Sequence, residues 1–312
     1  MTKIGALTDI HGTNISEIVE DFRREQVSLV LLLGDFSGYG NFSGYRPALN
    51  LQEKQGYGPR ESRPKVRETR YEMASRILKP LSTLTDVPVF VIGGNMDSGY
   101  KDTMSKVVRE YHNFIDMESR NRFDLDGITI LRYISPDMCF RLNPVKNRVL
   151  QAETMRTLLE DQQKLLKDLH ECNGPTIVMS HHPPYGYGDA TDTVDYYIDP
   201  ETGKQIGIKE RWSGSKKQNQ KKYEPIYKKI NAGDRDLTEI IEETKPTAVV
   251  FGHIHENNEI APPALEIGTR IPVKPGEVVK SLALNTGPAM KENCYALLTV
   301  EEGNVSYELS RY

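Results

Sequence analysis

Five short apolar runs alternate with segments of helical spacing along most of the chain. The runs are Ile4–Thr8, Leu29–Leu33, Val87–Ile92, Thr176–Met179 and Thr247–Phe251. Continuous runs of this length, rich in β-branched residues, are typical of parallel strands covered on both faces. Between them, apolar residues recur at helical spacing in Asn14–Gln26, Val66–Leu84, Ala152–Cys172 and Asp234–Thr244. Strands that alternate with helices predict an α/β layered fold.

The pattern changes after His255, where short strands are predicted without helices between them. These strands are Ile271–Val273, Ser281–Leu284, Cys294–Val300 and Val305–Leu309. Gly, Pro and Asn turns join them, which favours antiparallel pairing. Two further segments fit neither pattern, and long segments of this kind are usually functional lids or disordered inserts. We therefore predict a single domain over residues 1–312 with insertions at about 37–64 and 185–231.

Composition narrows the class of protein. The chain has 312 residues, of which 38% are hydrophobic and 27% charged, so it can bury a sizeable core. No apolar run approaches the roughly 18 residues of a membrane helix, and the N-terminus lacks the features of a signal peptide. The three cysteines lie far apart without a CxxC pair. This usage argues against a disulfide framework or a thiolate zinc site and favours a cytoplasmic protein without membrane contacts.

The net charge of −4 argues against bulk binding of nucleic acid. A local exception is Glu201–Lys229, which holds nine Lys or Arg against three Glu, and Arg60–Arg70 holds five against two. The simpler interpretation of both stretches is a solvated surface. The alternative is a cover over an anionic substrate, formed by the lysines and aromatic residues Lys216, Lys217, Lys221, Lys222, Tyr185, Tyr187 and Trp212.

Metal-ligating residue types follow each of the five predicted parallel strands. In chain order these are Asp9 and His11, Asp35, Asn95 and Asp97, His181 and His182, and His253 and His255. The carboxyl ends of parallel strands form the ligand crevice of an open α/β sheet, so these residues can converge. Each motif alone has an ordinary interpretation, because an Asp after a strand often caps a helix and Gly-Asp is common in turns. The complete ordered set favours a metal centre.

The set has the composition of a dinuclear centre. Seven side chains provide ligands for two divalent cations, and a carboxylate such as Asp35 can bridge ions roughly 3.5–4 Å apart. Two such ions bring +4, whereas Asp9, Asp35 and a bridging hydroxide bring −3, which leaves +1 to attract a phosphate. Mixed His, carboxylate and amide ligands favour manganese, with iron, zinc and nickel as alternatives. The seven ligands are Asp9, His11, Asp35, Asn95, His181, His253 and His255.

The motifs DIHG, GD, GGNMD, SHHPP and GHIH resemble those of the calcineurin-like metallophosphoesterase superfamily, over residues 4 to about 300. The resemblance implies a four-layer α/β/β/α sandwich of two mixed sheets, with the antiparallel tail strands in the second sheet. It also implies one ion held by Asp9, His11, Asp35 and His255. The other ion would be held by Asp35, Asn95, His181 and His253, with His182 in the outer sphere.

Met96 departs from the family pattern. Most members carry a His there that assists the leaving group, and a thioether cannot donate a proton. Phosphodiesterase-like members that carry Cys at this position are the more similar branch. The lost His removes a general acid that is typically worth about 10²–10⁴-fold. His182 or a residue of an insertion is the candidate replacement, whereas Asp97 is expected to orient a ligand or loop.

The resemblance implies a metal-dependent phosphoester hydrolase with a bridging hydroxide as nucleophile. A phosphodiesterase acting on nucleotides or similar diesters is the first hypothesis, with Asp35, Asn95, His182 and Asp97 as catalytic candidates. A phosphomonoesterase, including a protein phosphatase, is the alternative. A non-catalytic scaffold is a third hypothesis, although scaffolds tend to lose ligands and every ligand position is filled here. Nothing in the sequence decides the oligomeric state.

Overall fold

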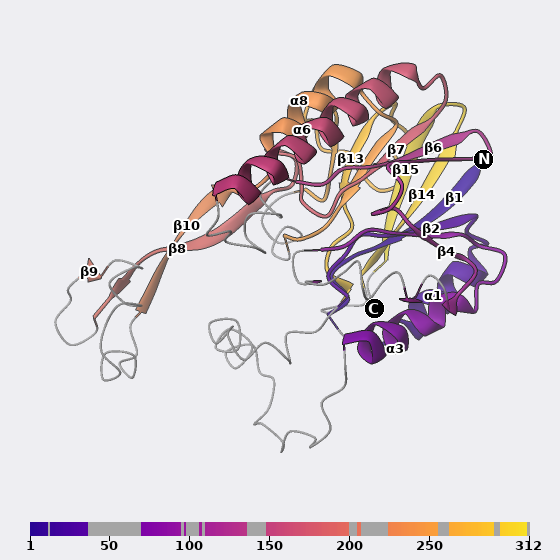
Figure 1. Ribbon diagram of the computed structural model, residues 1–312, viewed down its shortest axis with the longest axis horizontal. Coiled ribbons are helices and arrows are strands. Elements are labelled where there is room, and N and C mark those ends of the chain that lie inside the picture. Colours follow the sequence, from indigo (N-terminus) through magenta and orange to yellow (C-terminus); the bar gives the residue numbers. More distant parts are fainter. Residues whose placement is uncertain are drawn as a thin grey trace, which may run out of the picture.

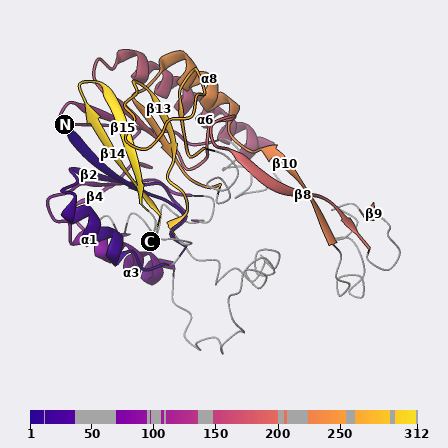
Figure 2. The same ribbon diagram turned by 180° about the vertical axis from the view of Figure 1, so that it is seen from behind.

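The computed structural model describes residues 1–11, 13–36, 70–94, 97, 106–107, 110–135, 148–199, 205–206, 224–254, 262–289 and 294–310. Two six-stranded sheets pack against each other and carry helices on their outer faces (Figure 1). The same layers are visible from behind (Figure 2). The four-layer α/β/β/α sandwich that the sequence predicts is confirmed.

The first sheet is built around β1 and contains both directions of pairing. Its spatial order is β15 (Asn304–Ser310), β14 (Tyr295–Glu301), β1 (Thr2–Leu7), β2 (Leu29–Leu32), β3 (Val89–Val91) and β4 (Phe114–Asp116). Strands β1 to β4 are parallel, whereas β14 is antiparallel to β1 and β15 is antiparallel to β14. Three of the five predicted apolar strands, β1, β2 and β3, therefore lie side by side.

The second sheet holds the other two predicted apolar strands. Its spatial order is β12 (Ala264–Glu266), β13 (Leu282–Asn285), β11 (Ala248–Phe251), β7 (Thr176–Met179), β6 (Ile128–Arg132) and β5 (Arg122–Leu125). The four central strands are parallel, and the edge strands β12 and β5 are antiparallel to their neighbours. The ends of β7 and β11 thus face the ends of β1 to β3 from the opposite sheet.

Helices cover both outer faces, and each lies within a segment of predicted helical spacing or extends slightly beyond it. Helices α1 (Ser16–Arg24) and α3 (Arg70–Ser82) pack on the first sheet, and α6 (Arg148–Glu171) and α8 (Arg235–Thr244) pack on the second. The N-terminus of α8 is capped by Asp234, whose carboxylate accepts a hydrogen bond from the backbone N–H of Leu237.

Alternation along β2 shows why the apolar runs are continuous. Leu29, Leu31 and Leu33 point into the core between the two sheets, whereas Val30 and Leu32 pack against the α1–α3 layer. All five side chains are buried. A strand that buries both faces needs apolar residues at every position, which explains its lack of a polar–apolar alternation.

The predicted tail strands are divided between the sheets. Strands β14 and β15 are antiparallel as expected, but they extend the sheet that contains β1, so their predicted place in the second sheet is wrong. Strand β13 joins the second sheet, but it is parallel to β11. Ile271–Val273 is not a strand. Its Pro272 lacks a backbone N–H for a ladder and makes only a single bridge with Leu265.

The second predicted insertion contains strands that the apolar pattern does not indicate. Strands β8 (Ala190–Ile198) and β10 (Glu224–Asn231) form a long antiparallel ribbon, and β9 (Gln205–Ile206) pairs with β8. The ribbon projects away from the sandwich (Figures 1 and 2). The first insertion, 37–64, lies outside the described residues. In the described part of the chain, no helix combines the length and apolar character that spanning a membrane requires.

Candidate metal centre

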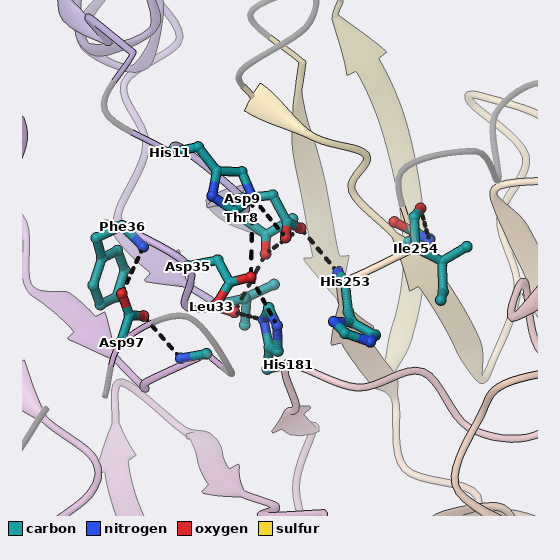
Figure 3. A network of polar contacts seen from close by, with 12 residues as sticks. Thr8, Asp9, His11, Leu33, Asp35, Phe36, Asp97, His181, His253 and Ile254 are labelled. Carbon is teal, nitrogen blue, oxygen red and sulfur yellow. Dashed lines mark hydrogen bonds and ion pairs between the residues drawn. The ribbon is translucent and has the colours of Figure 1, made fainter. Parts of the chain in front are cut away.

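The ends of β1, β2, β7 and β11 bring predicted metal ligands together between the two sheets (Figure 3). Asp9, Asp35 and His181 offer ligand atoms that all lie within 4.8 Å of one another, and all three side chains are buried. His11 joins them from the β1 loop and His253 from the β11 loop. Two predicted ligands, Asn95 and His255, and also Met96, lie outside the described residues.

Asp35 occupies the middle of the cluster. One of its carboxylate oxygens, Oδ2, lies 3.9 Å from Nε2 of His11 and 3.5 Å from Nε2 of His181. The two imidazoles belong to different predicted ligand sets, one from each sheet. A carboxylate placed between them has the position required to bridge two cations.

Asp9 is held in a fixed orientation by its neighbours. Its Oδ2 accepts hydrogen bonds from the Thr8 hydroxyl and from the backbone N–H of His253, both at 2.9 Å. Its Oδ1 lies 3.7 Å from Nε2 of His11. The contact with His253 crosses from the first sheet to the second, so one carboxylate ties two ligand loops together. The sequence indicates Asp9, but it gives no signal for the supporting role of Thr8.

The tautomer of His181 follows from its partner. Nδ1 lies 2.7 Å from the backbone carbonyl of Leu33, which can only accept, so Nδ1 carries the proton. In neutral His181, Nε2 is then the nitrogen with the free lone pair, and it faces Asp35. Fixing one ring nitrogen on a carbonyl is the usual way to orient a metal-binding histidine.

Asp35 and His181 also shift each other's protonation. Burial acts to raise the pKa of Asp35, but the charge of His181 outweighs it and lowers that pKa below its usual value. Burial likewise acts to lower the pKa of His181, but the Asp35 carboxylate raises it to about 9. Both shifts have the same cause, which is the close approach of the Asp35 carboxylate and the His181 ring in buried surroundings. A divalent cation at this position would favour the ionised form of the carboxylate and the neutral form of the ring.

The backbone is strained at the predicted ligands. Asp9, His11, Asp35 and His253 all have positive φ, between 45° and 71°. Residues other than glycine rarely adopt this conformation, and positions that keep it cluster at functional sites. Four of the nine such residues in the described part of the chain are predicted metal ligands. The ligand loops therefore adopt backbone conformations that are unfavourable in themselves but place the side chains at the site.

His182 lies beside the cluster as well. Its ring stacks on that of His253, with centroids 4.1 Å apart and an interplanar angle of 12°. His181, His182 and His253 offer ring nitrogens within 4.8 Å of one another. The hydroxyl of Ser180 fixes the loop by donating to the backbone carbonyl of His182 at 2.7 Å. The geometry therefore places His182 close enough to ligate or to act from the outer sphere.

Asp97 connects two ligand loops through their backbones (Figure 3). Its Oδ1 accepts from the N–H of Phe36 at 3.0 Å, and its Oδ2 accepts from the N–H of Gly94 at 2.9 Å. Phe36 directly follows Asp35, and Gly94 directly precedes Asn95. Both carboxylate oxygens are engaged by backbone donors, which is the arrangement of a residue that orients loops.

One aromatic residue predicted to cover the substrate has another role. Tyr187 is buried, and its hydroxyl donates to Glu242 at 2.8 Å and accepts from the N–H of Gly268 at 2.9 Å. A side chain this buried cannot cover a substrate, so the predicted place of Tyr187 in the cover is wrong. The ring of Tyr185 is covered by the guanidinium of Arg235 at 4.6 Å. The other residues of that predicted cover, Lys216, Lys217, Lys221, Lys222 and Trp212, lie outside the described residues.

The chemistry of the donor set fits divalent cations. Two buried carboxylates, Asp9 and Asp35, lie 3.5–3.9 Å from ring nitrogens of two imidazoles, His11 and His181. The charge of Asp9 also acts to raise the pKa of Asp35. Oxygen and imidazole nitrogen ligands in this proportion suit manganese, iron or zinc. Gly252 lets the loop after β11 approach Asp9 closely, since a Cβ there would lie 2.6 Å from Oδ2 of Asp9.

Comparison with known proteins assigns the family. The profile of the calcineurin-like phosphoesterase family matches residues 2–257. No curated protein matches the chain in sequence. Because the profile covers most of the chain, the protein belongs to the calcineurin-like phosphoesterase family. It is a metal-dependent phosphoester hydrolase, and the predicted resemblance is confirmed.

Comparison with solved structures finds matches at low sequence identity. A dimetal phosphatase from Danio rerio is 9% identical, with a TM-score of 0.54 over 100% of this chain and 99% of that chain. TT1561 of Thermus thermophilus is 12% identical, with a TM-score of 0.48 over 99% of this chain and 98% of that chain. An archaeal phosphodiesterase is 11% identical, with a TM-score of 0.41 over 99% and 100%. Of these three, the Danio rerio structure is similar enough to show a common fold.

Proposed function

We propose that the protein hydrolyses phosphate diesters, with nucleotides or similar diesters as substrates, at a centre of two divalent cations. Manganese is the first choice of metal. The position of Asp35 between His11 and His181 carries the proposal, because a shared carboxylate is what a dinuclear site requires. Asp9, His11, Asp35 and His255 would hold one ion, and Asp35, Asn95, His181 and His253 the other.

Cations bound there would supply Lewis acidity toward the phosphate and an activated water as the nucleophile. The side chains of the protein hold this arrangement in advance. Thr8 and the His253 amide orient Asp9, the Leu33 carbonyl orients His181, and burial of Asp9 and Asp35 excludes bulk water. Preorganised groups of this kind lower the barrier because they need not reorganise during the reaction.

Charge favours a diester over a monoester. Two divalent cations with Asp9, Asp35 and one hydroxide carry a net charge of +1, and a phosphate diester carries a single negative charge. A monoester dianion would need a further cation for the same balance. Met96 also favours a diester substrate. It stands where a general-acid His is usual, and the family members that lack this His and resemble the chain are phosphodiesterase-like.

We assign the proton donor to His182 and loop positioning to Asp97. His182 lies against His253 and carries a titratable ring, whereas both oxygens of Asp97 accept from backbone amides. A His182→Gln variant should keep hydrolysis of p-nitrophenyl esters, whose leaving group needs little protonation. It should lose about 10²–10⁴-fold on alkyl esters. An equal loss on both substrates would rule out this role for His182.

The direct experiment compares bis-p-nitrophenyl phosphate with p-nitrophenyl phosphate. Metal-free protein is supplied with manganese, and kcat/KM is measured for each ester. Preference for the diester supports the proposal, and preference for the monoester assigns the protein as a phosphomonoesterase instead. Binding of two ions without turnover of either ester would contradict both and indicate a scaffold. Activated esters are chosen so that Met96 does not mask an intact centre.

A further inference from the structure

A buried arginine reaches from the second sheet to the chain segment that links the two sheets. Arg132 ends β6, and its side chain is 6% exposed. Its Nη1 donates to Oε2 of Glu118 at 2.7 Å, and its Nη2 donates to Oδ1 of Asn121 at 2.7 Å. Nη2 also lies 3.4 Å from a carboxylate oxygen of Asp161 on α6. Two ends of one planar guanidinium are therefore fixed in different directions.

Glu118 connects Arg132 to the loop after β3, which contains Gly93 and Gly94 and leads to Asn95 (here called the metal loop). It follows β4 at the crossing from the first sheet to the second, and its side chain is 13% exposed. While Oε2 binds Arg132, Oε1 accepts from the backbone N–H of Gly93 at 3.3 Å. The next amide, that of Gly94, is held by Asp97. Two carboxylates thus fix two consecutive amides directly before Asn95.

The other end of the connection lies next to His181. Strand β6 is parallel to β7, with Arg132 beside Met179, two residues before His181. The backbone N–H of Tyr133, the residue after Arg132, donates to the carbonyl of Met179. Glu118 and Arg132 therefore link the loop of Asn95 on the first sheet with the strand that leads to His181 on the second.

We propose that Glu118 and Arg132 are positioning residues that set the spacing between the two halves of the metal centre. The inference rests on the proposed function, since it concerns the same site. Replacing a buried ion pair by apolar residues is often neutral or stabilising, so stability alone does not explain this one. A carboxylate that joins a guanidinium to a loop amide fixes a direction and a distance, which is what a dinuclear centre needs from its surroundings.

The test uses the Glu118→Gln variant of the full chain. Glutamine has the same size, but one of its two terminal atoms is an NH2 group that cannot accept from Gly93 or Arg132. Metal-free proteins are titrated with manganese(II), and electron paramagnetic resonance distinguishes a spin-coupled pair from isolated ions. Asp161→Asn is the matched control, because among the described residues Asp161 contacts the same guanidinium and Asn121 but makes no hydrogen bond with Gly93 or Gly94. Melting temperatures of the metal-free proteins report on folding.

Wild-type protein should bind two ions that give a coupled spectrum. In Glu118→Gln, the ion assigned to Asn95 and His181 should bind about 10–100-fold more weakly. Isolated-ion signals should then appear at the manganese concentration that fills both wild-type sites. Asp161→Asn should keep both dissociation constants and the coupled spectrum. Arg132→Lys keeps a positive charge opposite Glu118 but loses the planar guanidinium that donates to Glu118 and Asn121 at once. It should therefore weaken binding of the same ion by a smaller factor.

A lower melting temperature in Glu118→Gln, with both dissociation constants and the coupling unchanged, would show a purely structural role and overturn the inference. An equal effect in Asp161→Asn would overturn it too, because the link through Gly93 would then not be the cause. If Glu118→Gln does not fold, Arg132→Lys takes its place. Manganese dissociation constants in Arg132→Lys equal to those of the wild-type protein would then overturn the inference. Failure of wild-type protein to bind a coupled pair would instead refute the dinuclear centre itself, and the positioning role with it.

Discussion

Replacing Gly94 by alanine would push the loop before Asn95 away from Asp35. A Cβ at Gly94 would lie 2.2 Å from Oδ1 of Asp35 and 2.4 Å from its backbone nitrogen, whereas ordinary van der Waals contact begins at 3.4 Å. The loop must therefore move by about 1.0 Å, the difference between 3.4 Å and the 2.4 Å to the Asp35 backbone nitrogen, because a backbone atom cannot rotate away as the carboxylate can. A misplacement of about 1 Å can cost about 100-fold in rate, or about 2.7 kcal/mol in activation free energy.

The assay is kcat/KM for bis-p-nitrophenyl phosphate at saturating manganese, with metal content measured on the same samples. Gly5→Ala is the matched control, because a Cβ at Gly5 would lie 2.7 Å from the buried ring of Phe22, in the α1 layer. It should lower the free energy of unfolding by about 1–3 kcal/mol through overpacking. Activity per folded molecule should stay unchanged. If Gly94→Ala retained full kcat/KM, close packing of the two loops would not be what positions the ligands.

Further expectations concern the ligands and their supports. Asp35→Asn should abolish turnover and lower metal content together, and full activity would disprove a bridging role. Asp97→Asn should lower kcat equally for aryl and alkyl diesters by about 10–100-fold, because it misplaces loops; a loss confined to alkyl esters would reveal a proton donor. Tyr187→Phe should lower the free energy of unfolding by about 1–3 kcal/mol in urea, since the hydroxyl joins Glu242 and Gly268, with metal content unchanged. Manganese at 100 times its dissociation constant should stabilise the protein by about 2.7 kcal/mol, and an unchanged melting temperature would argue against binding to the folded state.

The metal loops could be predicted because their signal is local. Each ligand follows an apolar run within a few residues, and within each sheet parallel strands bring such ends to one edge whatever the order of the strands. The two edges meet because the sheets pack against each other. Asp9, Asp35, His181 and His253 converge as expected. The same local reasoning located the helices, because their apolar spacing is an intrinsic property of each segment.

Pairing between distant segments could not be predicted in the same way. The apolar run of β1 does not indicate that β14, almost 300 residues away in the chain, is its neighbour in the sheet. Nor does any spacing connect Glu118 to Gly93 or to Arg132, because each contact depends on how the two sheets face each other. The strands β8 and β10 were missed because they lack the apolar pattern of a buried strand.

The position of β1 between β2 and β14 has a consequence for synthesis of the chain. On the ribosome, β1 gains β2 as a partner early, but its other edge waits until residues near 300 have emerged. At 5–20 residues per second, this delay is roughly 15–60 s. An unpaired apolar edge is a template for association with other chains during that time. Slower growth or added chaperones should therefore raise the yield of folded protein more than added metal does, because the nascent chain has no complete centre for a metal to stabilise.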